Sequence, residues 1–249
     1  MDDEQQPRPD HGLYLDYGYG SHVGLRRELN EDASVVTDSL FAVADGMGGH
    51  EAGEVASALA VQALAEGWDA APGPITRVEL QACLDDADER IREATDAKAG
   101  TTLTGAVLVE AGQRLQWLVF NIGDSRTYLH QDGRLRQLTR DHSQVQEMFE
   151  SGMITAEELR DHPNRNVITR ALGAGDLFSG DYTMAPVEAG QRLLICSDGL
   201  TGELTDQQIA DILDAGRSPQ DTVDWLIHQA LREGGRDNVT VIVVDVREG

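Results

Sequence analysis

The sequence predicts an α+β fold in which antiparallel β-sheets pack on one another and pairs of helices lie outside them. The predicted elements follow one another as strands, two helices, many strands, two more helices and a closing strand. Strands and helices that occur in separate runs favour antiparallel sheets over a regular βαβ alternation. The chain has 249 residues, of which 40% are hydrophobic, so one large domain can bury a substantial core.

The first part of the chain predicts a tail and three strands. Residues 1–10 are polar and contain two prolines, so we expect a disordered tail ahead of one domain over residues 11–249. Residues 14–19 alternate weakly between apolar and polar types and predict the first strand. Residues 33–37 and 40–44 predict a strand pair joined by a tight turn.

Two amphipathic helices are predicted next, over residues 51–68 and 76–97. Thr76 and Glu79 have the spacing of a capping box at the start of the second helix. The residues expected on the inward faces are Val55, Leu59 and Leu64 in the first helix and Val78, Leu80, Leu84 and Ile91 in the second.

The second half of the chain predicts more strands, a polar excursion and a closing helix pair. The predicted strands are 101–109, 113–121, 125–130, 135–138, 178–184, 191–196 and 239–246. Residues 141–165 have few core residues and contain two short helical patterns, which indicates a small mobile excursion. Residues 205–214 and 218–232 begin with polar capping residues and predict helices.

The composition excludes several classes of partner. The net charge is −24, whereas nucleic acids and anionic membranes require a positive face, so we expect neither as a partner. The acidic start lacks the pattern of a signal peptide, and no apolar segment is long enough to cross a membrane. Cys83 and Cys196 lie outside any zinc or redox pairing. We therefore expect a cytoplasmic protein for which a monomer is sufficient.

The segment 40–50, Leu-Phe-Ala-Val-Ala-Asp-Gly-Met-Gly-Gly-His, carries the first functional signal. Its apolar start predicts a buried strand that ends at Asp45, and the glycines that follow are not expected to continue a regular element. A carboxylate at a strand end, followed by accessible backbone, can hold a hard cation with side-chain and carbonyl oxygens. An ordinary acidic turn is the alternative for this segment alone.

Three more acidic turns favour the cation site over an ordinary turn. The strand-end aspartates are Asp45, Asp124, Asp198 and Asp237. Together with Asp32, they are expected to line one pocket at the edge of the sandwich. Crowded carboxylates repel one another unless cations are present, and oxygen ligands suit Mg²⁺ or Mn²⁺ better than zinc.

Two such ions about 3.5–4 Å apart can activate a bridging water for displacement at phosphorus. Arg27 is placed in the sequence to bind the phosphate with its planar guanidinium. The residues by themselves thus indicate a metal-dependent phosphoester hydrolase.

The sequence also resembles the metal-dependent serine/threonine phosphatases of the protein phosphatase 2C (PPM) family, in their compact bacterial form. The resemblance spans about residues 12–245. It rests on eight blocks in the order of the family: GLRRELNED (24–32), VADGMGG (43–49), TTLT (101–104), NIGDSR (121–126), LTRDHS (138–143), VITRALG (167–173), CSDGL (196–200) and GRDNVT (235–240).

The resemblance implies a four-layer α-β-β-α sandwich and a two-metal site. It implies that Asp45 bridges two Mn²⁺ or Mg²⁺ ions and that the Gly46 carbonyl binds the second ion. Asp198 and Asp237 would complete the first ion's ligands. The resemblance further implies that Glu31 and Asp32 act on the second ion, directly or through water.

The resemblance assigns a third ion to Asp124 with Asp198, as in bacterial relatives, and the substrate phosphate to Arg27. It implies attack by a metal-bridging hydroxide without a phospho-enzyme, and a variable flap over residues 143–165 that influences substrate choice. Animal members carry a histidine, proposed as the general acid, where this sequence has Met47. We therefore assign the proton for the leaving oxygen to a metal-bound water.

The function implied is hydrolysis of phosphoserine and phosphothreonine in proteins, opposing a cellular Ser/Thr kinase. Two alternatives stay open at this point. One is a catalytically dead relative that serves as a binding module, although the expected ligands are all present. The other is a phosphatase for small phosphoesters.

Overall fold

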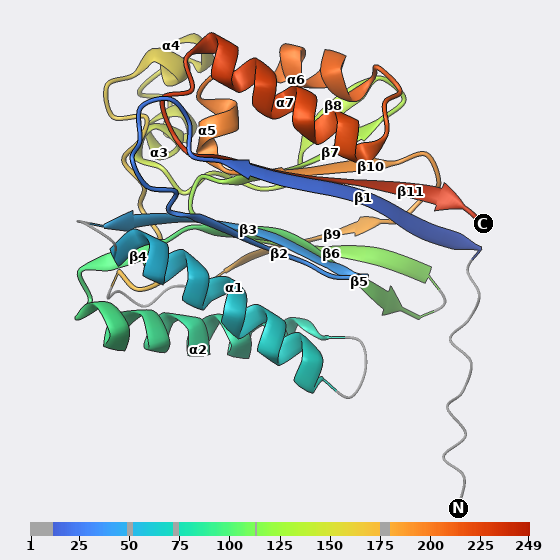
Figure 1. Cartoon of the computed structure of the whole chain (residues 1–249), viewed down its shortest axis with the longest axis horizontal. Coiled ribbons are helices and arrows are strands. Elements are labelled where there is room, and N and C mark those ends of the chain that lie inside the picture. Colours follow the sequence, from blue (N-terminus) through green and yellow to red (C-terminus); the bar gives the residue numbers. More distant parts are fainter. Residues whose placement is uncertain (1–11, 49–51, 72–74, 113, 175–179) are drawn as a thin grey trace, which may run out of the picture.

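The computed structural model describes residues 12–48, 52–71, 75–112, 114–174 and 180–249. The predicted tail over residues 1–10 lies outside this part of the chain. Figure 1 shows four layers, with two sheets packed face to face and helices on both outer sides, which confirms the predicted sandwich. No helix among the described residues is long and apolar enough to cross a membrane.

The first sheet contains five strands in the order β1-β11-β10-β7-β8, and all its neighbouring strands are antiparallel. Its strands are β1 (Leu13–His22), β7 (Arg126–Gln131), β8 (Arg134–Gln137), β10 (Arg192–Cys196) and β11 (Val239–Glu248). Helices α5 (Asp198–Thr201), α6 (Asp206–Leu213) and α7 (Pro219–Glu233) cover its outer face.

The second sheet has the order β2-β3-β5-β6-β9, with a short strand β4 paired to β3. Its strands are β2 (Asp32–Val36), β3 (Leu40–Gly48), β4 (Ala99–Thr101), β5 (Leu103–Ala111), β6 (Arg114–Ile122) and β9 (Asp181–Pro186). Helices α1 (Ala52–Ala70) and α2 (Arg77–Thr95) cover its outer face.

Both faces of β3 are buried, which explains its unbroken apolar sequence. Leu40 and Ala42 pack in the core under α1 and α2, whereas Phe41 and Val43 pack in the core between the two sheets. Successive side chains of a strand point to opposite faces, so a strand between two apolar layers needs apolar residues at every position.

The strand β3 continues through the glycines to Gly48, so the expectation that it stops at Asp45 is wrong. Gly46 to Gly48 pair with Thr101 to Ala99 of β4. A Cβ atom on Gly46 would lie 2.1 Å from the carbonyl oxygen of Gly53. The missing side chain therefore lets α1 start directly against the strand, and β4 supplies the hydrogen bonds that extend it.

Helices α1 and α2 lie at the predicted positions, but one residue predicted on the inward face of each helix is exposed. Leu80, Leu84 and Ile91 are buried, and the Thr76–Glu79 capping box is present. Val78 is 78% exposed, because a residue two positions before Leu80 lies on the opposite side of an α-helix. Val55 is 40% exposed.

In α1 the alanines form the buried face: Ala56, Ala60 and Ala63 are all buried, together with Leu64. Small side chains allow α1 and α2 to approach closely. At Gly67 a Cβ atom would lie only 2.2 Å from Cys83 Sγ of α2. The close packing of the two helices thus selects the alanine face over the side that carries Val55.

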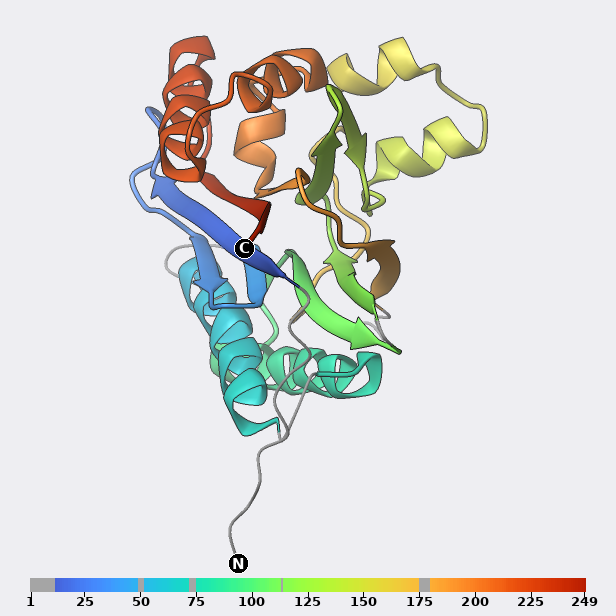
Figure 2. The same cartoon turned by 90° about the vertical axis from the view of Figure 1, so that its right-hand side faces the viewer.

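The predicted polar excursion forms α3 (Gln144–Glu150) and α4 (Ala156–Asp161). Figure 2 shows both helices in yellow, standing beside the sandwich next to α6. Ser143 caps α3, and Thr155 forms a capping box with Glu158 at the start of α4. Arg140 Nε donates a hydrogen bond of 2.6 Å to Glu150 Oε1, which ties α3 to the end of the first sheet.

Candidate metal centre

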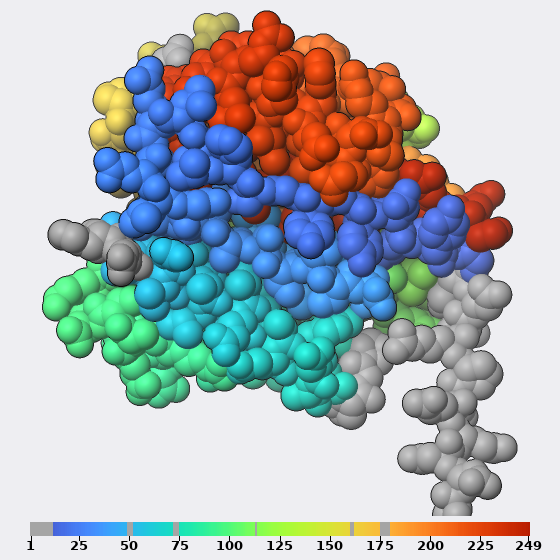
Figure 3. Space-filling view, viewed as in Figure 1, coloured from blue at the N-terminus to red at the C-terminus, as the bar shows by residue number. Residues whose placement is uncertain are grey.

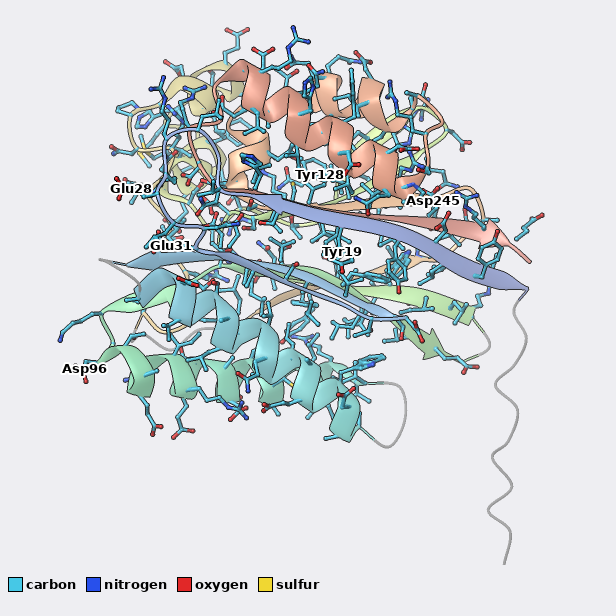
Figure 4. All side chains as sticks on the ribbon, in the orientation of Figure 1. Tyr19, Glu28, Glu31, Asp96, Tyr128 and Asp245 are labelled. Carbon is cyan, nitrogen blue, oxygen red and sulfur yellow. The ribbon has the colours of Figure 1, made fainter. Side chains whose placement is uncertain are left out.

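The antiparallel register brings the four strand-end aspartates to one end of the sandwich. Cys196 of β10 pairs with Val241 of β11 and with Arg126 of β7. Asp198 lies two residues beyond Cys196, and Asp124 lies two residues before Arg126, so both leave the sheet at the same edge. Figure 4 shows this end of the molecule, where the labelled Glu31 lies between the two layers of strands.

Asp32 and Asp45 contribute the first pair of carboxyls. They stand directly opposite each other in the antiparallel β2–β3 ladder. Ser197 Oγ donates a hydrogen bond of 2.8 Å to Asp32 Oδ2. Asp32 Oδ1 is buried and has no hydrogen-bond partner among the described residues. Burial, together with the charges of neighbouring aspartates, raises the pKa of Asp32 to about 7.

The backbone of Asp45 is held on both sides by Thr102. The Asp45 N–H donates to Thr102 Oγ1 at 3.1 Å, and the Thr102 N–H donates to the Asp45 carbonyl at 2.9 Å. Burial of the carboxyl raises the pKa of Asp45 well above its usual range, and the nearby charges of Asp32 and Asp198 raise it further. The fold thus holds a crowded carboxyl in a fixed place.

Asp198 and Asp124 extend the cluster toward α3 and α4. Burial raises the pKa of Asp198, and the charge of Asp237 adds to this effect. Burial and the charge of Asp198 likewise raise the pKa of Asp124 well above its usual range. Both residues line a cavity of about 740 Å³ between α3 and the segment 201–207. The cavity joins the acidic cluster to the predicted flap.

Asp237 lies beside Arg27. Arg27 Nη2 donates to Asp237 Oδ2 at 2.8 Å, and the Asn238 N–H donates to Asp237 Oδ1 at 2.9 Å. The hydrogen bond from Arg27 to Asp237 raises the pKa of Arg27, although partial burial of the guanidinium lowers it. The Arg27 side chain is 49% exposed, so its guanidinium remains accessible to a ligand at the mouth of the cluster.

Glu31 and Gly46 occupy the other side of Asp45. The Gly46 N–H donates to the Glu31 carbonyl at 3.0 Å. A Cβ atom on Gly53, in the first turn of α1, would lie 2.2 Å from Glu31 Oε1, so this close packing requires a glycine. Burial raises the pKa of Glu31. The structure therefore places all the sequence-predicted site residues around one end of the sandwich.

The cluster has the chemistry of a divalent-cation site, although its geometry is not that of a closed ligand set. Within the described ranges, no group of three or more His, Cys, Asp or Glu side chains is already arranged to hold an ion. One oxygen of Asp237 accepts a hydrogen bond from the Arg27 guanidinium. The acidic residues of the site are each partly exposed, and the atoms they offer to an ion are all oxygens. Asp32 Oδ1 has no hydrogen-bond partner among the described residues. Hard cations that carry several water ligands fit such a site.

Several supporting residues were not singled out by the sequence. Thr102 Oγ1 and Ser125 Oγ lie 2.8 Å apart beneath Asp45, and Ser197 Oγ also receives a hydrogen bond from the Thr240 N–H. These residues lie within the quoted blocks, so their place next to the aspartates was a usable signal. A hydroxyl in a strand does not reveal its partner across the sheet, however, and the contacts could not be read from the sequence.

Two other residues of the quoted blocks make structural contacts beside the cluster. Arg126 donates to both oxygens of Asp141 and to Tyr128 Oη, so its guanidinium pairs with a carboxylate of the protein. His142 is buried, and its Nδ1 accepts a hydrogen bond from the Gly123 N–H at 3.1 Å.

The chain is similar to one known protein family and to solved structures. The family model described as Protein phosphatase 2C matches residues 25–233. The serine/threonine protein phosphatase PstP of Mycobacterium tuberculosis is 43% identical over 94% of this chain, which spans 45% of that relative's length. The serine/threonine phosphatase stp of Listeria welshimeri is 36% identical, with coverage of 89% of this chain and 92% of its own.

Solved structures show the same fold. A crystal structure of the M. tuberculosis phosphatase PstP/Ppp is 41% identical and has a TM-score of 0.85, with coverage of 94% of this chain and 99% of its own. A crystal structure of the PstP catalytic domain in complex with two manganese ions has a TM-score of 0.83 at 40% identity, with the same coverage of both chains. The family match over most of the chain, the two-sheet fold and the carboxylate cluster lead to one conclusion: the chain belongs to the protein phosphatase 2C family.

Proposed function

We propose that this chain is a metal-dependent protein phosphatase that hydrolyses phosphoserine and phosphothreonine in protein substrates. The observation that carries the proposal is the concentration of Asp32, Asp45 and Asp198 at one end of the sandwich, beside the accessible Arg27 guanidinium. Relatives that are 36–43% identical carry the name serine/threonine phosphatase, which supports the same activity.

The carboxylates would hold two Mn²⁺ or Mg²⁺ ions. The charges of the other four aspartates all act on Asp45, which would contact both ions. Asp198 and Asp237 would complete the first site. The Gly46 carbonyl, with Glu31 and Asp32 directly or through water, would serve the second.

A third ion is a further part of the proposal. Asp124 and Asp198 border the cavity below α3, and the charge of Asp198 acts on Asp124. These two residues would hold that ion. The two manganese ions in the PstP catalytic domain support the pair of ions but not the third.

The ions, Arg27 and Asp32 would have separate roles in the reaction. When bound, the ions would lower the pKa of water and stabilise charge at phosphorus. Arg27 would bind the phosphate through the planar guanidinium that now faces Asp237. Asp32 has a pKa near neutrality and an unpartnered Oδ1, so it can hold a proton or a water at that atom.

Proteins that carry phosphoserine or phosphothreonine would be the substrates, and a Ser/Thr kinase would supply them. The cavity of about 740 Å³ extends from Asp198 to Val145 and Gln146 of α3, which is large enough for residues that flank a phosphorylated side chain. This extension beyond the carboxylates favours a peptide over a small phosphoester. The retained carboxylates favour an enzyme over a dead binding module.

The test is a metal-dependence curve for release of phosphate from a phosphothreonine peptide. We expect no turnover in EDTA, saturable activation by Mn²⁺ or Mg²⁺, and a higher kcat/KM for the peptide than for p-nitrophenyl phosphate. Asp69→Asn, on the exposed end of α1, serves as a control that should retain full activity. A folded protein without metal-dependent turnover would contradict the proposal. Equal kcat/KM values for all esters would favour a small-molecule phosphatase.

A further inference from the structure

The loop between β1 and β2, residues 23–31, carries Arg27 and Glu31 but buries little apolar surface of its own. It forms no helix or strand. Its two leucines face solvent, with Leu25 62% exposed and Leu29 44% exposed. A loop without a hydrophobic anchor depends on polar contacts for its conformation.

One buried side chain supplies these contacts at both ends of the loop. Asn238 is only 4% exposed. Its Nδ2 donates to the Val23 carbonyl and to the Leu29 carbonyl, each at 2.9 Å. Its Oδ1 accepts the Glu31 N–H at 2.8 Å. Both amide protons and the acceptor oxygen are therefore used on backbone groups of the same loop.

The position of Asn238 in the chain links the loop to the candidate metal centre. Asn238 directly follows Asp237, whose Oδ2 receives the hydrogen bond from Arg27. The start of the loop also packs on this turn, because a Cβ atom on Gly24 would lie 2.2 Å from the Asp237 carbonyl oxygen. The Leu25 N–H donates to the Gly235 carbonyl at 2.7 Å.

We propose that Asn238 is a positioning residue that closes the loop 23–31 through three hydrogen bonds and thereby holds Arg27 for the substrate phosphate. The inference deepens the proposed function, on which its catalytic part rests. An asparagine side chain meets the requirement, because one short amide group offers two donor protons and an acceptor oxygen. An aspartate would present oxygen to two carbonyls, and an alanine would leave three partly buried backbone groups without this partner.

The experiment combines Asn238→Ala and Asn238→Asp with Arg27→Ala and the double variant Arg27→Ala/Asn238→Ala. Val246→Ala is the matched control for loss of stability. It lies in the same strand, β11, and is 1% exposed in the core between the sheets, far from the loop. Each protein is assayed with a phosphothreonine peptide in Mn²⁺, and its amide hydrogen exchange is measured without metal.

We expect Asn238→Ala to lower kcat/KM about ten- to a hundredfold, mainly through KM, because the phosphate-binding group is displaced. In the Arg27→Ala background the same change should cost clearly less than in the parent, because the effect through Arg27 is gone and only the effect through Glu31, whose N–H also donates to Asn238, remains. Asn238→Asp should be at least as damaging as Asn238→Ala. Val246→Ala should keep kcat/KM within about twofold of the parent.

Amide hydrogen exchange measures how firmly the loop is held, and this measurement does not depend on enzymatic activity. The amides of Leu25 and Gly46 donate to Gly235 and Glu31, so Asn238→Ala removes neither acceptor. Both amides should nevertheless exchange faster in Asn238→Ala, and not in Val246→Ala, if Asn238 holds the loop.

Unchanged exchange at these amides would overturn the proposal, as would losses in kcat/KM that multiply independently in the double variant. An inactive parent protein would instead contradict the proposed function, and the exchange result would still decide whether Asn238 closes the loop.

Discussion

Asp32 and Asp45 face each other across the antiparallel β2–β3 ladder, with the two carboxyls on the same side of the sheet. Like charges directly opposite each other destabilise a sheet pair. This pair also lies next to Asp198. The fold therefore holds two mutually repelling groups in a register that only a proton or a cation makes favourable. The space-filling view in Figure 3 shows the first part of the chain, in shades of blue, as a band between the orange and red helices on one side and the cyan and green helices on the other.

The central role of Asp45 can be tested with Asp45→Asn. We expect this variant to fold and to lose Mn²⁺-dependent hydrolysis of p-nitrophenyl phosphate, because the carboxylate proposed to contact both ions is gone. Its metal-free form should melt a few degrees higher than the parent, since removal of about 1 kcal/mol of repulsion raises Tm by about 2–4 °C at this size. Unchanged turnover in a folded variant would refute the bridging role.

The stability of the metal-free protein should depend on pH through Asp32. Its pKa is about 7 in the folded state, against about 3.9 in an unfolded chain. Between these values the folded state binds more protons, so the free energy of unfolding falls as pH rises from about 4 to about 7 and then levels off. Thermal melts in EDTA at pH 5.5 and 7.5 should show the lower Tm at pH 7.5.

Asp32→Asn should reduce this difference in Tm, whereas Asp69→Asn, at an exposed position, should leave it unchanged. Added Mn²⁺ should stabilise the protein more at pH 7.5 than at pH 5.5, because carboxylate ligands must be deprotonated. A Tm that rises with pH in EDTA to the same extent in parent and Asp32→Asn would contradict this account of Asp32.

Arg27 should contribute to phosphate binding rather than to folding. The expected result for Arg27→Ala is an increase in KM and a loss of about ten- to a hundredfold in kcat/KM, with Tm within a few degrees of the parent. Arg27→Lys should recover only part of this loss, because an ammonium group cannot bind phosphate in the bidentate manner. The neighbouring Arg26→Ala, which is also exposed, provides the control. Equal effects of the two alanine variants would argue against a specific role.

Arg126, in contrast, should contribute to folding stability rather than to phosphate binding. It binds both oxygens of Asp141 at 2.6–3.0 Å, and their side chains are 20% and 9% exposed. Arg126→Ala would leave the buried Asp141 carboxylate unpaired, at a cost of about 3–5 kcal/mol, or roughly 10 °C in Tm. Calorimetry or thermal melts measure this loss. A stable Arg126→Ala variant with a raised KM would instead identify Arg126 as a substrate contact.

Signals in the amino-acid sequence were enough to predict the layers, most elements and the residue types of the site. Hydrophobic periodicity marked β3 and α2, the Thr76–Glu79 spacing marked a helix start, and the strand-end aspartates marked the acidic edge. These signals are local, because each depends on residues within a few positions of one another.

Which of these residues meet depends on contacts between segments that are far apart in the chain. Arg27 and Asp237 are 210 positions apart, and Asn238 closes a loop more than 200 residues away, so no local pattern could reveal either contact. The glycines after Asp45 look like a strand end until β4 pairs with them, and Val55 looks like a core residue until α2 packs against the alanine face of α1. Periodicity shows how apolar one face of an element is, whereas register and close packing depend on the partner against which that face packs.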